Sequence, residues 1–102
     1  MPDPSQRQLE RHIRASAGDS ANVVFTAHAR QRMRQRQVTL PMLPETLKRG
    51  VLARPPEPDV KHPALLCRMR HFVAGVNVAV VVYVEYPAPS LVMVTVSDVN
   101  GD

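Results

Sequence analysis

One row of side chains in this sequence could act on a phosphate group. His28, Arg32 and Arg36 follow one another at intervals of four residues, so in a helix they lie on one side. A histidine can accept or donate a proton near neutral pH. The planar guanidinium of arginine suits bidentate contacts with phosphate oxygens. The row therefore predicts a site that holds a phosphate and moves a proton beside it.

An apolar stripe lies next to this row. At about 100° per residue, a helix over residues 25–36 gathers three apolar side chains within an arc of about 80°: Phe25, Ala29 and Met33. We expect the row, at one edge of the stripe, to be half-buried, and Arg30 and Arg34, on the far side, to be solvated. A half-buried arginine needs a partner, which is either a ligand phosphate or, in a structural role, a carboxylate or backbone carbonyl.

The charge distribution points to the same half of the chain. The sequence has 13 Lys and Arg against 9 Asp and Glu, a net charge of +4. Residues 1–54 hold ten of the cations and four of the acids, a net of +6, and the remainder nets −2. Eleven of the cations are arginines, which favours a phosphate-bearing partner. The alternative is a solvated basic surface, the usual role of a run of charges.

Length and cysteine content limit the classes of protein. With 102 residues, 44% of them apolar, the chain makes one domain with a small core and no large enclosed chamber. The single cysteine, Cys67, excludes an internal disulfide and a four-cysteine zinc site. The four histidines lack the spacing of metal ligands. We therefore expect neither a metal nor a cofactor.

The sequence predicts a soluble, cytoplasmic protein. Residues 1–7 lack the apolar segment of a signal peptide, and the longest apolar run, Val78 to Val84, is too short to cross a bilayer. A single thiol suits a reducing compartment. We expect no membrane contact.

A capping box marks the first helix. Ser5 and Gln8 have the spacing of this motif, which predicts a helix over residues 6–17. Its apolar stripe is narrow and predicts only loose docking: Leu9, Ile13 and Ala17. We therefore divide the chain into this helix, within residues 1–20, and one α+β domain, residues 21–102.

A further short helix is expected before Gly50. Thr39 is a good N-cap, and Gly50 stands where the helix would end. Pro44 either loosens the first turn or moves the start to about residue 44. Leu43 and Leu47 would face the core.

The period changes from helix to strand after Gly50. A Pro-rich loop over residues 55–63 and turns at Gly75 and Pro87 separate four segments of strand character: residues 51–54, 64–73, 76–85 and 91–98. The predicted fold class is α+β, with two or three N-terminal helices packed on an antiparallel β-meander of three to four strands.

Alternation assigns side chains to the faces of these strands. One face of the second strand carries Leu66, Arg68, Arg70 and Phe72, so the two arginines could complete a phosphate clamp. His71 points to the opposite face. In the last strand, simple alternation places one set of residues together: Leu91, Met93, Thr95 and Ser97.

The motif Ala27-His28-Ala29-x-x-Arg32-Met33-x-x-Arg36-x-Val38-Thr39 resembles the bacterial domain-of-unknown-function 4258 family. The resemblance covers residues 25–98 and includes the final Val94-Thr95-Val96. That family looks like a member of the barnase, EndoU, colicin and RelE-like (BECR) toxin fold, whose members are often metal-independent ribonucleases. The resemblance implies the same fold for this chain.

The resemblance also implies an activity. It suggests a ribonuclease toxin of a bacterial toxin–antitoxin or related conflict system, which cleaves RNA by attack of the substrate 2′-hydroxyl without a cofactor. The catalytic residues would be His28, Arg32 and Thr95. Phosphate and RNA would be bound by Arg36 and, from strand alternation alone, by Arg68 and Arg70. The expected partners are RNA, free or on the ribosome, and a cognate antitoxin or immunity protein.

Two other functions fit the same residues. A non-catalytic nucleic-acid-binding module would use the arginines for phosphate contacts without proton transfer. A protein-interaction domain would use its Val-rich sheet to pair with another chain.

Overall fold

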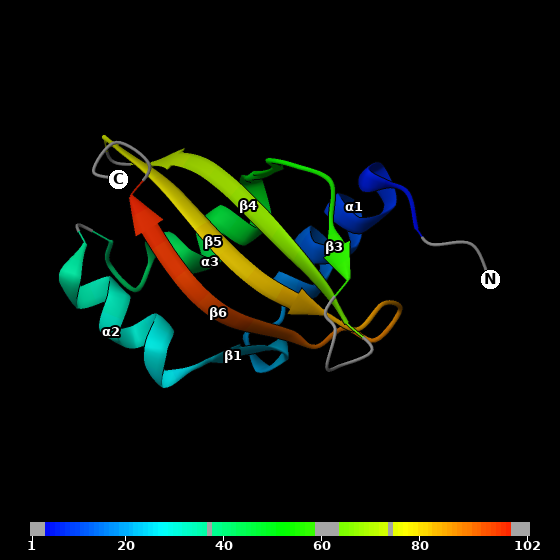
Figure 1. Cartoon of the computed structure of the whole chain (residues 1–102), viewed down its shortest axis with the longest axis horizontal. Helices are drawn as coiled ribbons and strands as arrows, with labels where there is room; N and C mark the ends of the chain where they lie inside the picture. The colour runs from blue at the N-terminus through cyan, green and yellow to red at the C-terminus, as the bar shows by residue number, and fades with distance from the viewer. Residues whose placement is uncertain (1–3, 37, 59–63, 74, 99–102) are drawn as a thin grey trace.

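A mixed six-stranded sheet carries the helices in the computed structural model of this chain (Figure 1), which describes residues 4–36, 38–58, 64–73 and 75–98. The elements follow in the order α1 (Gln6–Ala17), a 3₁₀ turn (Ser20–Asn22), β1 (Val23–Phe25), α2 (Ala27–Gln35), α3 (Met42–Arg49), β2 (Val51–Leu52), β3 (Glu57–Pro58), β4 (Leu65–Val73), β5 (Val76–Val84) and β6 (Leu91–Asp98). The strand order is β1-β6-β5-β4-β2, and β3 also pairs with β4. Strand β1 runs parallel to β6, whereas the other pairs are antiparallel.

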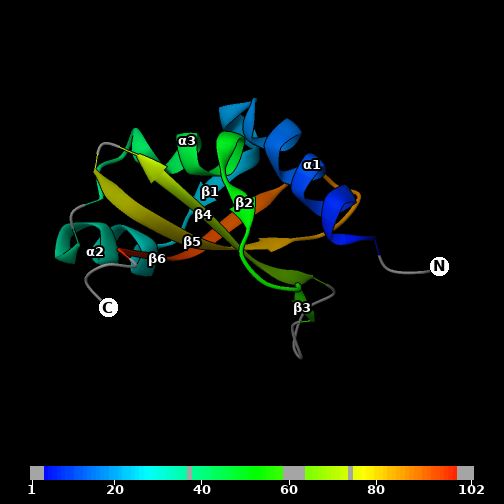
Figure 2. The ribbon, with the colours of Figure 1, turned by 90° about the horizontal axis from the view of Figure 1, so that it is seen from above.

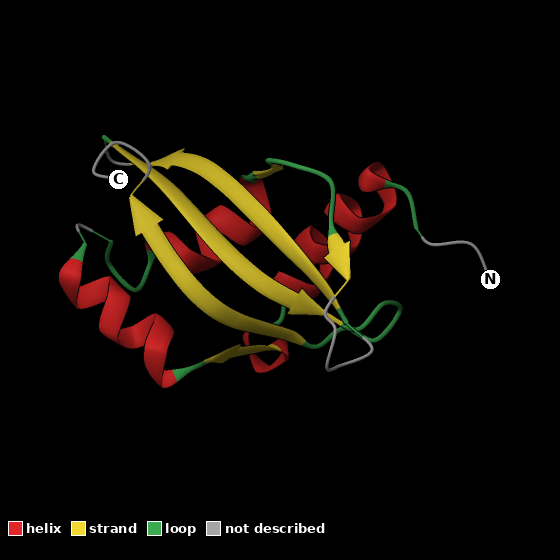
Figure 3. Ribbon diagram, viewed as in Figure 1, coloured by secondary structure: helices red, strands yellow, loops and turns green. Residues whose placement is uncertain are grey.

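The helices are distributed unequally about the sheet. Figure 2 shows α1 and α3 together on one side, and α2 apart from them beside β6. Figure 3 gives the view onto the other side, where the long strands lie in front of α1 and α3. In the described part of the chain no helix covers that face. We call it the open face.

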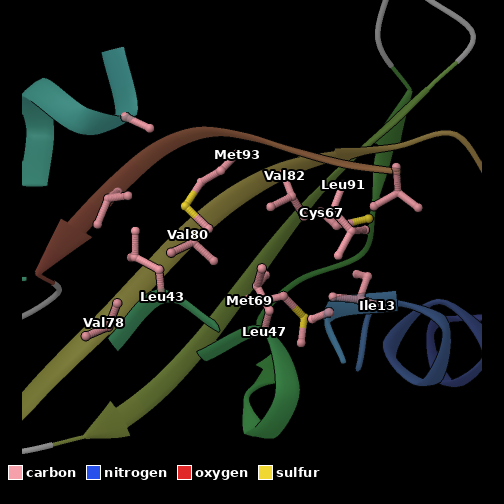
Figure 4. Close-up of a cluster of buried hydrophobic side chains, with 14 of the residues drawn as sticks. Ile13, Leu43, Leu47, Cys67, Met69, Val78, Val80, Val82, Leu91 and Met93 are labelled. Carbon is pink, nitrogen blue, oxygen red and sulfur yellow. The ribbon is translucent and has the colours of Figure 1, made fainter. Parts of the chain in front are cut away.

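The core lies between the sheet and the pair α1 and α3 (Figure 4). Its largest fully buried side chains come from both helices and from β4, β5 and β6: Leu9, Ile13, Leu43, Leu47, Met69, Val78, Val80, Val82, Val84, Leu91, Met93 and Val96. The prediction that Leu43 and Leu47 face the core is confirmed.

Helix α1 is part of this core. Its capping box is present, with Ser5 N–H donating to Gln8 Oε1 at 2.7 Å and Gln8 N–H donating to Ser5 Oγ at 3.1 Å. Leu9 and Ile13 are fully buried, and α1 packs on α3. The expected loose docking is therefore not what the structure shows, because two large apolar side chains suffice when a second helix supplies the other wall.

Gly50 joins the helical layer to the edge of the sheet. Its N–H donates to Thr46 O at 2.8 Å, and its carbonyl accepts from Arg14 Nε and Nη2 at 3.1 and 2.7 Å. A Cβ at this position would lie 2.7 Å from Arg70 O. A glycine is needed here because the turn after α3 passes directly against strand β4.

The prediction of an antiparallel meander of three to four strands is wrong in strand number and in direction. The described residues form six strands, and β1 makes the sheet mixed. Phe25 belongs to β1 and not to the following helix, which starts at Ala27 after the N-cap Thr26. Strands of two or three residues are too short to show alternation, so the sequence gives no local sign of β1 or β3.

Other local predictions differ from the structure in detail. Thr39 does not cap α3, which begins at Met42 after Pro41 and has no side-chain cap bond. Pro44 is the third residue of this helix, where its missing N–H is harmless. In the predicted Pro-rich loop, Glu57 and Pro58 pair with β4, and residues 59–63 lie outside the described residues. Strands β4, β5 and β6 lie where the alternation predicts them, and Gly75 at their first turn has φ 80°.

The variant Ile13→Ala tests whether α1 is part of the core. Removing this fully buried side chain should lower the free energy of unfolding by about 2–5 kcal/mol, as measured by urea denaturation. Arg11→Ala, on the exposed side of the same helix, is the control and should change it by less than about 0.5 kcal/mol. Equal stabilities of the two variants would contradict the described packing.

Candidate functional site

The open face brings three of the candidate residues together. Register pairs Arg68 with Val81 and Arg70 with Ala79 across β4 and β5, and pairs β5 with β6 in the same way. Two rows of side chains result: the Thr95 row, Arg68–Val81–Thr95, and the Ser97 row, Arg70–Ala79–Ser97. Paired residues lie on the same face of a sheet, so Arg68, Arg70 and Thr95 share this one.

A β-bulge in β6 places Thr95 and Ser97 there. Val82 pairs with Met93 but Val81 pairs with Thr95, so Val94 is an extra residue. Leu91 and Met93 before the bulge are fully buried in the core. An extra residue reverses the face to which later side chains point. The simple alternation predicted for this strand, with Leu91, Met93, Thr95 and Ser97 on one face, is therefore wrong.

The two arginines of these rows have their guanidinium groups available. Within the described residues, the side chains of Arg68 and Arg70 make no hydrogen bond and no ion pair. Arg70 is exposed and Arg68 is half-buried. Between Arg70 and Ser97 lies the small residue Ala79, which is 2% exposed. The face thus offers two guanidinium groups on β4 with small or hydroxyl-bearing residues beside them.

Thr26 fixes α2 beside the bulge. Its N–H donates to Met93 O and its Oγ1 donates to Val94 O, both at 3.2 Å. The same Oγ1 accepts from Ala29 N–H at 3.1 Å as the N-cap of α2. One side chain therefore both starts the helix and ties it to the strand.

The flanks of α2 face different environments. Arg30 and Arg34 are exposed, as predicted, and line a surface pocket with Met33, Val38 and Leu40. The Arg30 guanidinium carbon lies 5.6 Å from the centre of the Phe25 ring. Helical geometry places residues 28 and 32 on the opposite flank of the buried Ala29. That flank faces away from Leu40 and toward the open face.

The level of each side chain along α2 follows from the Thr26 anchor. The helix advances about 1.5 Å per residue and β6 about 3.3 Å, and the two run side by side in the same direction (Figure 1). His28 is therefore about level with Thr95, and Arg32 about level with Ser97. His28 and Arg32 are thus the residues of α2 nearest in level to the β6 ends of the two rows.

Burial varies along the predicted row of α2. Arg32 and Arg36 are half-buried, as expected, whereas His28 is exposed. The reason is that a step of four residues overshoots one helical turn by about 40°, so the row winds round the helix and His28 lies farthest from the buried side. Arg32 Nε is buried with no hydrogen-bond partner in the described structure. Arg36 stands at the C-cap of α2.

One pocket on this face was not predicted from the sequence. It lies where the chain crosses from β2 to β3 over the edge of β4, and its lining includes Arg54, Pro55, Glu57, Leu66, Arg68 and Val81. The pairing of Glu57 with Leu66 brings this carboxylate to the open face. Only the tertiary pairing of β3 reveals it, because the sequence at this point has the composition of a loop.

Cys67 and His71 do not belong to the open face. Cys67 is fully buried in the core, and burial raises the pKa of its thiol to about 11. A thiol with this pKa stays protonated at neutral pH, so it is a poor nucleophile. His71 pairs with the core residue Val78, which confirms its predicted orientation. Neither side chain can contribute to the two rows.

Comparison with protein-family models, with curated proteins and with solved structures found no match to this chain. Among the residues that the structure describes, no three His, Cys, Asp or Glu side chains gather as a metal-binding group. None of the described helices is long and apolar enough to span a membrane.

The variant Thr26→Val tests the anchor of α2. It keeps the shape of the side chain and removes the hydroxyl that caps the helix and bonds Val94 O, so the free energy of unfolding should fall by about 1–2 kcal/mol. Urea denaturation followed by circular dichroism measures the change. Thr26→Ser retains the hydroxyl and should lose much less. A Thr26→Val variant as stable as the native chain would show that these hydrogen bonds do not hold the helix.

Proposed function

We propose that this chain is a metal-independent ribonuclease that holds the backbone of RNA on the open face beside α2. One observation carries the proposal. Arg68 and Arg70, whose guanidinium groups have no partner in the described structure, lie in the same two rows as Thr95 and Ser97. The rows end at α2, about level with His28 and Arg32. Cations, hydroxyls and one histidine therefore border a single uncovered surface.

Each side chain has a role in cleavage by the 2′-hydroxyl of the substrate. The imidazole of His28 accepts the 2′-hydroxyl proton as the 2′-oxygen attacks the phosphorus. Arg32 and Arg68 stabilise the negative charge that develops on the non-bridging phosphate oxygens. Thr95 donates its hydroxyl hydrogen to one of these oxygens. The bond to the 5′-oxygen then breaks, and this leaving oxygen takes a proton from the imidazolium.

The resemblance to the domain-of-unknown-function 4258 family supports this proposal. Its motif starts at Ala27, the first residue of α2, and the resemblance also includes Thr95 in β6, the strand beside which this helix lies. A BECR-like fold would place RNA on the open face of such a sheet. The chain would then be a toxin of a conflict system, and its antitoxin or immunity protein would act by blocking this face or the approach to it.

A non-catalytic RNA-binding module is the second candidate, and His28 favours it. This side chain is exposed and makes no hydrogen bond with another described residue. In many acid–base sites a second group orients the histidine. A module would need only the arginines, which bind phosphate without a proton transfer.

Cleavage of purified RNA by variants tests the proposal. The native chain should produce fragments that end in a 2′,3′-cyclic phosphate, with or without added ribosomes. His28→Ala should lower kcat about 10²- to 10⁴-fold and leave the affinity for RNA within about twofold. Arg68→Ala should lower both cleavage and affinity. Arg34→Ala, on the opposite flank of α2, is the matched control and should cleave like the native chain.

Three outcomes separate the candidate functions. Salt-dependent RNA binding without cleavage, by the native chain alone or with ribosomes, would overturn the nuclease and support the binding module. Absence of both binding and cleavage would overturn both RNA functions. Unchanged cleavage by His28→Ala would remove this residue from the mechanism.

A further inference from the structure

An exposed aromatic ring stands at one end of the open face. Phe72 pairs with Asn77 next to the β4–β5 turn, and alternation along β4 places it on the same face as Arg70 and Arg68. Its exposed fraction is 62%, the largest among the large hydrophobic side chains of the described structure. It makes no aromatic or cation–π contact with another described residue. The ring therefore contributes little to the core.

The surroundings of Phe72 are cationic. Arg70 lies two residues before it on the same face, about 7 Å along the strand, and its guanidinium has no partner in the described structure. Arg68 lies one further step along β4. A partner that meets this surface must bring negative charge beside a flat apolar group. A nucleotide carries both, a phosphate and a base, at comparable separation.

We propose that Phe72 stacks against an unpaired base, and that the open face binds single-stranded RNA along β4 in preference to duplex. This inference rests on the proposed RNA function and specifies its substrate. The two arginines hold successive phosphates, while the ring holds a base by its face. Stacking on an aromatic side chain next to a basic groove is the general way in which proteins bind single strands. A duplex keeps its bases paired inside and cannot present one to the ring.

The length of the surface fits a short run of nucleotides. From Phe72 to Leu66, β4 covers six residues, or about 20 Å. At the Leu66 end lies the pocket that contains Arg54, Glu57 and Arg68. A single strand would thus run from the ring, past both arginines, to a hollow lined by both charged and apolar residues. Its backbone would pass the Thr95 row on the way.

The variant Phe72→Trp provides a direct reporter, because the sequence contains no tryptophan. The probe is a 2′-O-methyl oligoadenylate of eight nucleotides, which cannot be cleaved by 2′-hydroxyl attack. Stacking of adenine on the indole should quench its fluorescence in a saturable titration. A 2′-O-methyl RNA duplex with the same number of phosphates should quench it much less. Leu40→Trp is the matched control, since Leu40 is also exposed, at 52%, but lies on the other flank of α2.

Affinities of two further variants complete the test. Phe72→Ala should weaken binding of the single strand about 5- to 150-fold and leave the salt dependence of binding unchanged. Arg70→Ala should reduce the slope of log affinity against log salt by about one phosphate contact. The difference separates stacking from charge. Phe72→Tyr keeps an aromatic ring and should bind almost as tightly as the native chain.

The results also distinguish this inference from the proposed function. If the native chain binds or cleaves RNA while Phe72→Trp gives no signal and Phe72→Ala binds normally, the stacking inference is wrong and the RNA function stands. Tighter binding of duplex than of single strands would overturn the inference as well. If the native chain binds neither probe and cleaves no RNA, the proposed function fails, and the exposed ring is better explained as a contact for a protein partner.

Discussion

The β-bulge at Val94 is the constraint on which the candidate site depends. Without this extra residue, Thr95 and Ser97 would follow Leu91 and Met93 into the core, and the open face would lose both hydroxyls. The carbonyl groups at the bulge also accept the two hydrogen bonds from Thr26 that set α2 beside β6. The bulge thus determines which residues of β6 belong to the two rows. Its carbonyl groups also fix the position of α2 beside β6.

Some arginine side chains of this protein bond to other described residues, whereas others have no described partner. Arg14 bridges Glu10 and the carbonyl of Gly50, and thereby holds α1 to the turn after α3. Arg49 pairs with Glu45 on the same helix. The arginines of the open face, Arg68 and Arg70, have no described side-chain partner and remain available to a ligand. The positions of the Arg68 and Arg70 guanidinium groups are therefore more informative about function than the net charge of +4.

Local signals in the sequence predicted the long strands, the cap of α1 and the shared face of Arg68 and Arg70, because each depends on residues close together in the chain. The features that the sequence could not predict depend on distant partners. Strand β1 exists because β6 is beside it, and the burial of Leu9 depends on α3. The bulge also has no signal in the sequence, because apolar and polar residues alternate in Val94-Thr95-Val96 as they do in a regular strand. The candidate site was thus predicted as a row on a helix and a pair on a strand, and only the structure shows that Thr95 shares the face of that pair.

The proposed function requires the open face and α2 to form one RNA-binding surface. Backbone amide shifts of the native chain, measured by NMR during titration with a 2′-O-methyl single strand, test it most directly. The largest changes should fall on Arg68 to Phe72, on Thr95 to Ser97 and on the first turns of α2, while α1 and α3 should change little. Changes confined to the exposed sides of α1 and α3, with none on these strands, would contradict it.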